Sequence, residues 1–350
     1  MPTSAINQWL AASLSEHYRL NGIARLSPLV YPTIENREPE PESRFWRVDT
    51  DDEQLILKRY KRGKTPARIH FEEEFQTRMH AADPELVPQL LTTTRGDKHF
   101  VLGSDQSWRL ERYFDSRHYK WWQCDWQPEQ CAEAGRFLSR FHRTSRAVTK
   151  RWQSQTYDTA FDTIDLAPLT GNDLEETMRK ALTSCADHPP AIRDFQRLLN
   201  DCRSLLRQSK PHLHAHTRGN QDELLLIHGD FHMGNLLFSG AQIRGIVDYE
   251  DVRLQTRLYE LGYAALMLCF PWTVEPGQDP LGLDQKFFSR FFQSYSETGA
   301  LTPDLPKHSI VTACILIIAW LLERSQDWSE PDSTSYRCCK RLIQAWRFYV

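Results

Sequence analysis

The hydrophobic and polar residues of the first part of the chain alternate in short runs, a pattern typical of β-strands. Polar, turn-rich stretches separate these runs, so a small antiparallel sheet is expected. The predicted strands are residues 25–31, 44–48, 54–58, 100–102 and 108–114. Residues 66–82 follow a helical period instead, because their apolar positions recur three or four apart. One helix is therefore predicted after the third strand.

From Pro128 onward the apolar spacing becomes mainly helical, and proline suits the first turn of a helix. Residues 151–222 are polar and broken by prolines, which predicts a helical insertion with helices within 173–182 and 192–208. The runs 224–227 and 243–247 are expected as a hairpin-like strand pair, with the turn at Ser239-Gly240 between them. Everything after residue 254 is expected to be helical.

Composition narrows the class of protein. With 350 residues, 40% hydrophobic and 25% charged, the chain fits a soluble two-lobed protein or one large domain. The net charge of −3 gives no overall basic field, so nucleic acid is not an expected partner. The longest apolar run, 310–322, is shorter than a membrane span and predicts a buried helix.

The cysteines and the first twenty residues indicate in which cellular compartment the protein is expected. Eight cysteines without a C-x-x-C pair favour reduced thiols over a zinc ribbon or a disulfide framework. Residues 1–20 lack a charged start followed by an apolar block, so no signal peptide is expected. A cytoplasmic protein without a membrane partner is the prediction, and the oligomeric state is not predicted.

Candidate chemistry lies in the stretch His228-Gly229-Asp230, followed by Asn235 and then by Asp248 thirteen residues later. Phosphoryl transfer needs a carboxylate that accepts the proton of the attacking hydroxyl, together with oxygen ligands for magnesium. Asp230 can be the catalytic base, and Asn235 and Asp248 can bind the metal. The order and spacing are those of the catalytic and metal loops of kinases.

These motifs resemble the aminoglycoside phosphotransferase and choline kinase family, and the similarity extends over residues 25–270. The resemblance implies an α+β, protein-kinase-like two-lobed fold that uses ATP and Mg²⁺. The N-lobe would be residues 1–114, a small antiparallel sheet with one helix. The C-lobe would be residues 115–350, mostly helical, with the insertion at 151–222.

The same resemblance assigns residues of the nucleotide site. Lys58 would grip the ATP phosphates, and Glu72 would be the helix glutamate that pairs with it. The backbone of residues 110–114, which includes Glu111 and Tyr113, would meet adenine. Asn235 and Asp248 would contribute to the same site through the metal.

Some features depart from the family pattern or have a simpler explanation. No glycine lies between Pro32 and Ser43, where a phosphate-covering loop is expected. The basic run 58–64 is expected as a solvated strand end and turn, apart from Lys58. His212, His214 and His216 are expected in an exposed loop rather than at a metal. Trp121, Trp122 and Trp126 are expected to pack in the core rather than to stack on an acceptor.

The expected function is transfer of the ATP γ-phosphate to a hydroxyl of a small molecule. A second hypothesis is a protein serine/threonine kinase similar to a bacterial stress-response kinase, because residues 134–142 are similar to a helix there. Homoserine kinase relatives share that helix, so it does not decide between the two. A third is a pseudokinase that binds nucleotide without turnover, which intact Asp230, Asn235 and Asp248 argue against.

Overall fold

The computed structural model divides the chain into two compact units. Unit 1 comprises residues 1–116, 151–165 and 244–250, and unit 2 comprises the remainder. The structure describes residues 3–20, 22–29, 45–61, 63–102, 106–117, 119–122, 125–154, 169–218, 224–272, 282–296, 307–325, 328 and 333–345. The glycine-free stretch 32–43 lies outside them.

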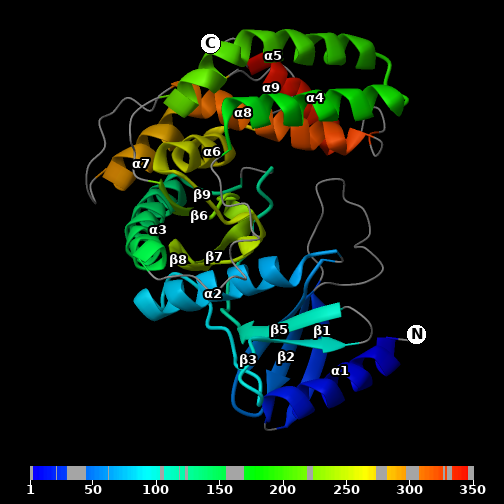
Figure 1. The fold of residues 1–350 in the computed structure, drawn as a ribbon, viewed down its shortest axis with the longest axis vertical. Helices are drawn as coiled ribbons and strands as arrows, with labels where there is room; N and C mark the ends of the chain where they lie inside the picture. The colour runs from blue at the N-terminus through cyan, green and yellow to red at the C-terminus, as the bar shows by residue number, and fades with distance from the viewer. Residues whose placement is uncertain are drawn as a thin grey trace. The chain divides into compact units, whose positions relative to one another are not determined.

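Unit 1 contains a five-stranded sheet in the order β1-β2-β3-β5-β4 (Figure 1). Neighbouring strands in this sheet all pair antiparallel, as the sequence predicts. The strands are β1 (Ile23–Leu29), β2 (Phe45–Thr50), β3 (Gln54–Arg59), β4 (His99–Leu102) and β5 (Gln106–Arg112). Helix α2 (Pro66–Ala82) has the predicted bounds, with Thr65 as its N-cap and Pro66 in its first turn.

Unit 1 also has a helix that the sequence prediction did not include. Helix α1 (Thr3–Tyr18) packs against the sheet through Leu10, Leu14 and Tyr18, which join the core cluster of β2, β3, β4 and β5. On β3 this cluster takes Leu55 and Leu57. Because side chains alternate along a strand, Lys58 projects from the opposite face. Packing against α1 thus helps to set the direction of Lys58.

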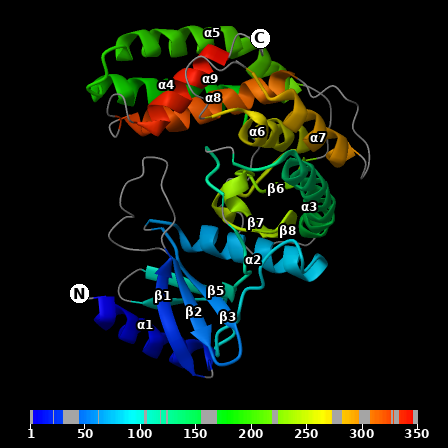
Figure 2. The same cartoon turned by 180° about the vertical axis from the view of Figure 1, so that it is seen from behind.

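Unit 2 is mostly helical, and α8 (Lys307–Glu323) contacts four of its helices (Figures 1 and 2). Those helices are α4 (Gly171–Asp187), α5 (Phe195–Arg218), α6 (Arg257–Cys269) and α9 (Thr334–Ala345). The unit also holds α7 (Gln285–Ser296) and most of α3 (Pro128–Ser154). The apolar run 310–322 therefore forms a buried helix, as predicted. Among the described residues no helix is both long and apolar enough to cross a membrane.

The strands that flank the reactive loops pair differently from the prediction. Strand β6 (Leu224–Ile227) pairs antiparallel with β9 (Arg253–Thr256), a strand that the sequence prediction assigned to helix. Strands β7 (Leu236–Ser239) and β8 (Gln242–Ile246) form a two-stranded sheet around the turn at Gly240. The predicted turn was correct, but it joins β7 to β8 rather than β6 to β8. The apolar run 236–238 supplies the missing strand.

Helix α5 corrects the prediction of an exposed histidine loop. It runs to Arg218 with Pro211 inside it, so residues 212–216 have helical backbone. A proline removes one backbone hydrogen bond from a helix and disfavours the turn before it. Burial of Leu213, which is 1% exposed, favours continuation of this helix past the proline.

Candidate active site

The loop that carries Asp230 follows β6 and leads into a short 3₁₀ turn, Met233–Asn235. Gly229 has φ +82°, and a Cβ at this position would lie 2.2 Å from the carbonyl oxygen of Asp251. Its N–H donates to Oε1 of Glu260 at 2.7 Å. Only glycine fits this tight backbone, which turns Asp230 out of the strand direction.

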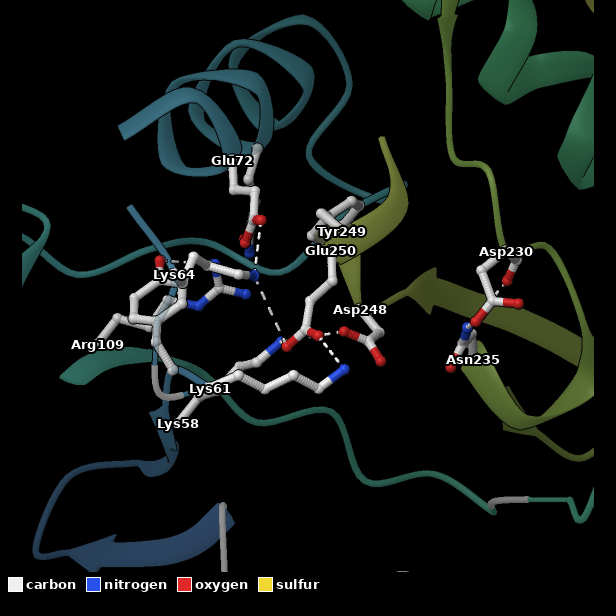
Figure 3. Close-up of polar contacts among 12 residues, drawn as sticks. Lys58, Lys61, Lys64, Glu72, Arg109, Asp230, Asn235, Asp248, Tyr249 and Glu250 are labelled. Atoms are coloured by element: carbon white, nitrogen blue, oxygen red, sulfur yellow. Dashed lines mark hydrogen bonds and ion pairs between the residues drawn. The ribbon is translucent and has the colours of Figure 1, made fainter. Parts of the chain in front are cut away.

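Several donors hold the Asp230 carboxylate. Tyr263 donates its hydroxyl to Oδ1 at 2.6 Å, and Asn235 donates its amide nitrogen to Oδ2 at 3.0 Å (Figure 3 shows the Asn235 contact). His232 Nε2 lies 3.2 Å from Oδ2. The N–H of Gly234 donates to His232 Nδ1 at 3.0 Å, so Nε2 is the ring nitrogen that faces Asp230 as a donor.

These donors decide the charge of Asp230. Burial alone would raise its pKa, but His232 and Tyr263 outweigh burial and hold the pKa well below the ordinary value of 3.8. Asp230 is therefore a carboxylate at neutral pH. Burial first, and then the charge of Asp230, raise the pKa of Tyr263, so Tyr263 remains a protonated donor.

A cavity of about 260 Å³ opens beside Asp230 within unit 2. Its walls are largely aromatic and aliphatic, with a few charged groups at fixed points. The apolar lining residues are Trp121, Tyr259, Tyr263, Met267, Leu316, Ile317 and Trp320. The charged ones are Asp230, Asp251, Arg253 and Glu323. Trp121, expected as a core residue, is both 8% exposed and part of this wall.

A second set of predicted residues meets in unit 1. Lys58 Nζ lies 3.1 Å from Oδ1 of Asp248 and 3.5 Å from Oε1 of Glu250 (Figure 3). The Lys58 side chain is 2% exposed, whereas that of Asp248 is 36% exposed. Asp248 has φ +70°, which is uncommon for a residue with a Cβ. Such a conformation often marks a functional position.

Glu72 does not pair with Lys58 as expected. Its Oε1 contacts Lys64 at 2.7 Å and Arg68 at 3.2 Å, although Glu72 itself is fully buried. Lys58 instead contacts two carboxylates of the metal loop, those of Asp248 and Glu250. Sequence reasoning missed the role of Glu250, which follows Asp248 by two residues.

The lysines of the basic run are not simply solvated. Lys61 Nζ lies 2.5 Å from Oε2 of Glu250, and Lys64 Nζ lies 3.8 Å from Oε1 (Figure 3). Lys64 is only 10% exposed, against 59% for Lys61. The spacing of Lys58, Lys61 and Lys64, three residues apart, was the available signal in the sequence.

The predicted adenine-binding segment is part of a hydrogen-bonded network. Glu111 is 5% exposed and accepts a hydrogen bond from Gln76 at 3.2 Å. The N–H of Tyr113 donates to the carbonyl of Gln54 at 3.1 Å. This N–H is therefore already used within unit 1, as is the carbonyl of Leu110, which accepts a hydrogen bond from the N–H of Leu91 at 2.9 Å.

The predicted metal ligands have suitable chemistry. Asn235 uses its amide nitrogen on Asp230, so its amide oxygen is the atom that it can offer to a cation. Asp248 offers a partly exposed carboxylate. Both are the hard oxygen donors that Mg²⁺ prefers. The structure thus brings Asp230 together with Asn235 in unit 2, and Lys58 together with Asp248 in unit 1.

Comparison with known proteins adds independent evidence. The model of the phosphotransferase enzyme family matches residues 39–292. Comparison with curated proteins gave no match.

Several solved structures share the fold. Amicoumacin kinase hAmiN, in complex with AMP-PNP, Ca²⁺ and Ami, is 17% identical over 96% of this chain and 92% of that chain, with a TM-score of 0.64. A microcompartment-associated aminopropanol kinase is 15% identical over 98% and 96% of the two chains, with a TM-score of 0.60. Choline kinase LicA from Streptococcus pneumoniae is 11% identical over 97% and 98%, with a TM-score of 0.57.

Proposed function

Because this chain belongs to the phosphotransferase enzyme family, we propose that it is a kinase that transfers the γ-phosphate of ATP, with Mg²⁺, to a hydroxyl of a small, positively charged acceptor. The observation that carries the proposal is the cavity beside Asp230. A donor-held carboxylate at the wall of an aromatic cavity is the arrangement that a general base for a small hydroxyl compound requires.

Cavity size favours a small acceptor. Its volume of about 260 Å³ lies below the 300–1,000 Å³ that is usual for drug-sized ligands. A monosaccharide or a short amino alcohol is of suitable size, whereas a multi-ring antibiotic is too large to be enclosed.

Cavity charge favours a cation. Asp230, Asp251 and Glu323 face the cavity together with a single guanidinium, that of Arg253, which pairs with Asp251 at 3.1 Å. Trp121 and Trp320 add aromatic faces, which attract ammonium groups. An amino alcohol combines the hydroxyl that Asp230 needs with the charge that these groups favour.

The chain's own residues have distinct parts in the reaction. Asp230 accepts the proton of the acceptor hydroxyl, and Tyr263, Asn235 and His232 orient its carboxylate. Lys58 contacts phosphate, and Asn235 and Asp248 hold the metal, as their motifs indicate. When bound, ATP supplies the phosphoryl group and Mg²⁺ neutralises its charge.

Matched acceptors test the proposal. Phosphate transfer from Mg-ATP is measured by ³¹P NMR for 1-amino-2-propanol, for 1,2-propanediol of the same size, for spectinomycin and for a generic protein substrate. We expect the highest kcat/KM for the amino alcohol. Preference for the diol or for spectinomycin would contradict the charge or the size argument, and transfer only to protein would favour a protein kinase.

Asp230→Asn tests the catalytic assignment. Loss of a general base typically lowers the rate about 10²–10⁴-fold, so we expect kcat to fall in that range. Affinity for Mg-ATP, measured by calorimetry, should stay near that of the wild type. Asp187→Asn, an exposed position on α4, is the matched control and should leave kcat unchanged. Wild-type kcat in Asp230→Asn would refute the assignment.

A further inference from the structure

The connection from β3 to α2 brings three lysines close to the carboxylate of Glu250. Lys58 stands near the end of β3, and Lys61 and Lys64 follow before α2 begins at Pro66. All three ammonium groups lie within 4 Å of the Glu250 carboxylate, at 3.5, 2.5 and 3.8 Å respectively (Figure 3). Arg68, on the first turn of α2, donates to the Glu250 carbonyl at 2.7 Å.

Several cations share carboxylates in this cluster. Four cationic side chains face the three carboxylates of Glu72, Asp248 and Glu250, so single carboxylates are shared between several cations. Glu72 is shared by Lys64 and Arg68, yet its Oε2 is buried with no hydrogen-bond partner among the described residues. If Asp248 binds a metal, Lys58 loses one of the two carboxylates that it contacts.

The cations differ in how easily they can change partner. Lys61 is 59% exposed, and exposed ion pairs contribute little to stability, so its contact with Glu250 can be exchanged at small cost. Lys64 is 10% exposed, and burial lowers its pKa despite the attraction of Glu72 and Glu250. An additional anion near Lys64 would therefore favour its charged form.

The sequence gives a reason why extra cations are needed. Residues 32–43, where a phosphate-covering loop is expected, contain no glycine and four glutamates. Glycine permits the closest approach of a backbone to a ligand, and glutamates repel phosphate, although Arg37 lies in the same stretch. This composition favours a search for phosphate-binding cations elsewhere in the chain.

We propose that Lys61 and Lys64 act with Lys58 as a three-lysine site for the polyphosphate of the nucleotide, and that Glu250 holds these lysines in place when no nucleotide is bound. The inference rests on the proposed function, because it assumes that a nucleotide binds. Phosphate oxygens compete with Glu250 for the ammonium groups. The β- and γ-phosphates carry negative charge that AMP lacks, so the lysines should strengthen the binding of ATP more than that of AMP.

Nucleotides with different numbers of phosphates test this site by a binding readout. Calorimetry with ATP, ADP and AMP, each with Mg²⁺, is carried out on the wild type and on Lys61→Gln, Lys64→Gln and Lys64→Arg. A lost charge-assisted contact weakens binding by about tenfold, and less where the group is exposed. We expect Lys64→Gln to weaken ATP binding about tenfold and Lys61→Gln roughly threefold. Affinity for AMP should stay within about twofold, and Lys64→Arg should restore most of the ATP affinity.

Lys98→Gln is the matched control. Lys98 is a half-buried lysine of unit 1 that donates to Thr92 at 2.7 Å, so the variant makes the same charge change away from the cluster. Thermal unfolding of each variant shows whether it folds. Because Lys61 is exposed, Lys61→Gln remains informative even if Lys64→Gln proves unstable.

Three results would overturn the inference. If the wild type binds ATP and Lys61→Gln and Lys64→Gln bind it equally well, the lysines do not contact phosphate and the proposed function stands. Equal losses for ATP and AMP would indicate a structural role instead. No binding of Mg-ATP by the wild type would refute the proposed function together with the inference.

Discussion

At the scale of single residues, Tyr263 is the closest donor to the expected catalytic base, at 2.6 Å from Oδ1 of Asp230. It also lines the cavity, so an acceptor hydroxyl must approach Asp230 beside it. A buried tyrosine that keeps its proton can orient the carboxylate without competing as a base.

Tyr263→Phe removes this donor. A donor to a carboxylate favours the charged form, so its loss should raise the pKa of Asp230 from its lowered position. We expect the acid limb of the kcat/KM profile to move to higher pH and kcat to fall about tenfold, the effect of one lost hydrogen bond to a charged group. Tyr18→Phe in unit 1 is the control. An unmoved acid limb would mean that Tyr263 has no influence on Asp230.

The candidate site residues that the sequence indicates lie in one short stretch of the chain. Asp230, Asn235 and Asp248 were recognisable because phosphoryl transfer needs those groups at that spacing. Tyr263 was not, because it follows Asp230 by 33 residues and only the packing of α6 brings it there. Glu250 was missed for another reason. Nothing in the sequence pattern shows that Lys58 contacts Glu250 rather than Glu72.

At the scale of elements, His99 on β4 connects the sheet of unit 1 to α2. Its Nδ1 lies 3.0 Å from Oε2 of Glu73, and Tyr60 donates to the other oxygen of that carboxylate at 3.0 Å. The bond to Glu73 raises the pKa of His99 above its ordinary value of 6.5, although partial burial opposes it. The charged form of His99 therefore stabilises this contact.

This raised pKa predicts how stability depends on pH. A group whose pKa is higher in the folded state contributes its full stabilisation below the unfolded pKa and loses it as pH rises through the folded pKa. We expect the free energy of unfolding to decline as pH rises from about 6.5 through the raised pKa of His99. His99→Gln should flatten this decline in urea titrations, whereas His188→Gln, at an exposed position, should not.

Helices α3 and α7 approach closely at Gly135. A Cβ there would lie 2.2 Å from the carbonyl oxygen of Phe291, so a larger residue must push the helices apart. Alanine normally stabilises a helix by up to about 1 kcal/mol relative to glycine, whereas overpacking costs about 1–3 kcal/mol. We expect Gly135→Ala to lower the unfolding temperature. Gly282→Ala, where the Cβ has open space, should not, and a stabilised Gly135→Ala would contradict the close approach.

Elements with a strong period were predictable, and those defined by long-range pairing were not. Helix α2 has the predicted bounds because its cap and apolar spacing are local. Strand β9 has only four residues and depends on pairing with β6, so its own sequence does not distinguish it from the start of α6. Helix α1 was missed although Leu10, Leu14 and Tyr18 recur four residues apart, which is the spacing of one helical face.

At the scale of the whole molecule, cysteines are confined to one unit. All eight lie in the ranges of unit 2, and the seven that the structure describes are buried reduced thiols. Burial raises the pKa of Cys314 and of Cys339, which suppresses their reactive thiolate forms. Alkylation of these seven thiols therefore reports when the interior of unit 2 opens, while unit 1 contributes no thiol signal.

We expect the seven thiols to resist iodoacetamide in the native protein and to become reactive together as urea is raised. Helices α4, α5, α6 and α9 all contact α8, which carries Cys314, and Cys131 on α3 contacts the carbonyl of Leu268 on α6, so a single cooperative transition should expose all seven thiols. Peptide mapping by mass spectrometry measures each site, with circular dichroism on the same samples. Early labelling of Cys185, Cys202 and Cys339 alone would show that α4, α5 and α9 open before α3, α6 and α8. Adding Mg-ATP and the preferred acceptor to the same titration should then delay labelling of Cys269 on α6, the helix that carries Tyr263, because a bound ligand stabilises the folded site.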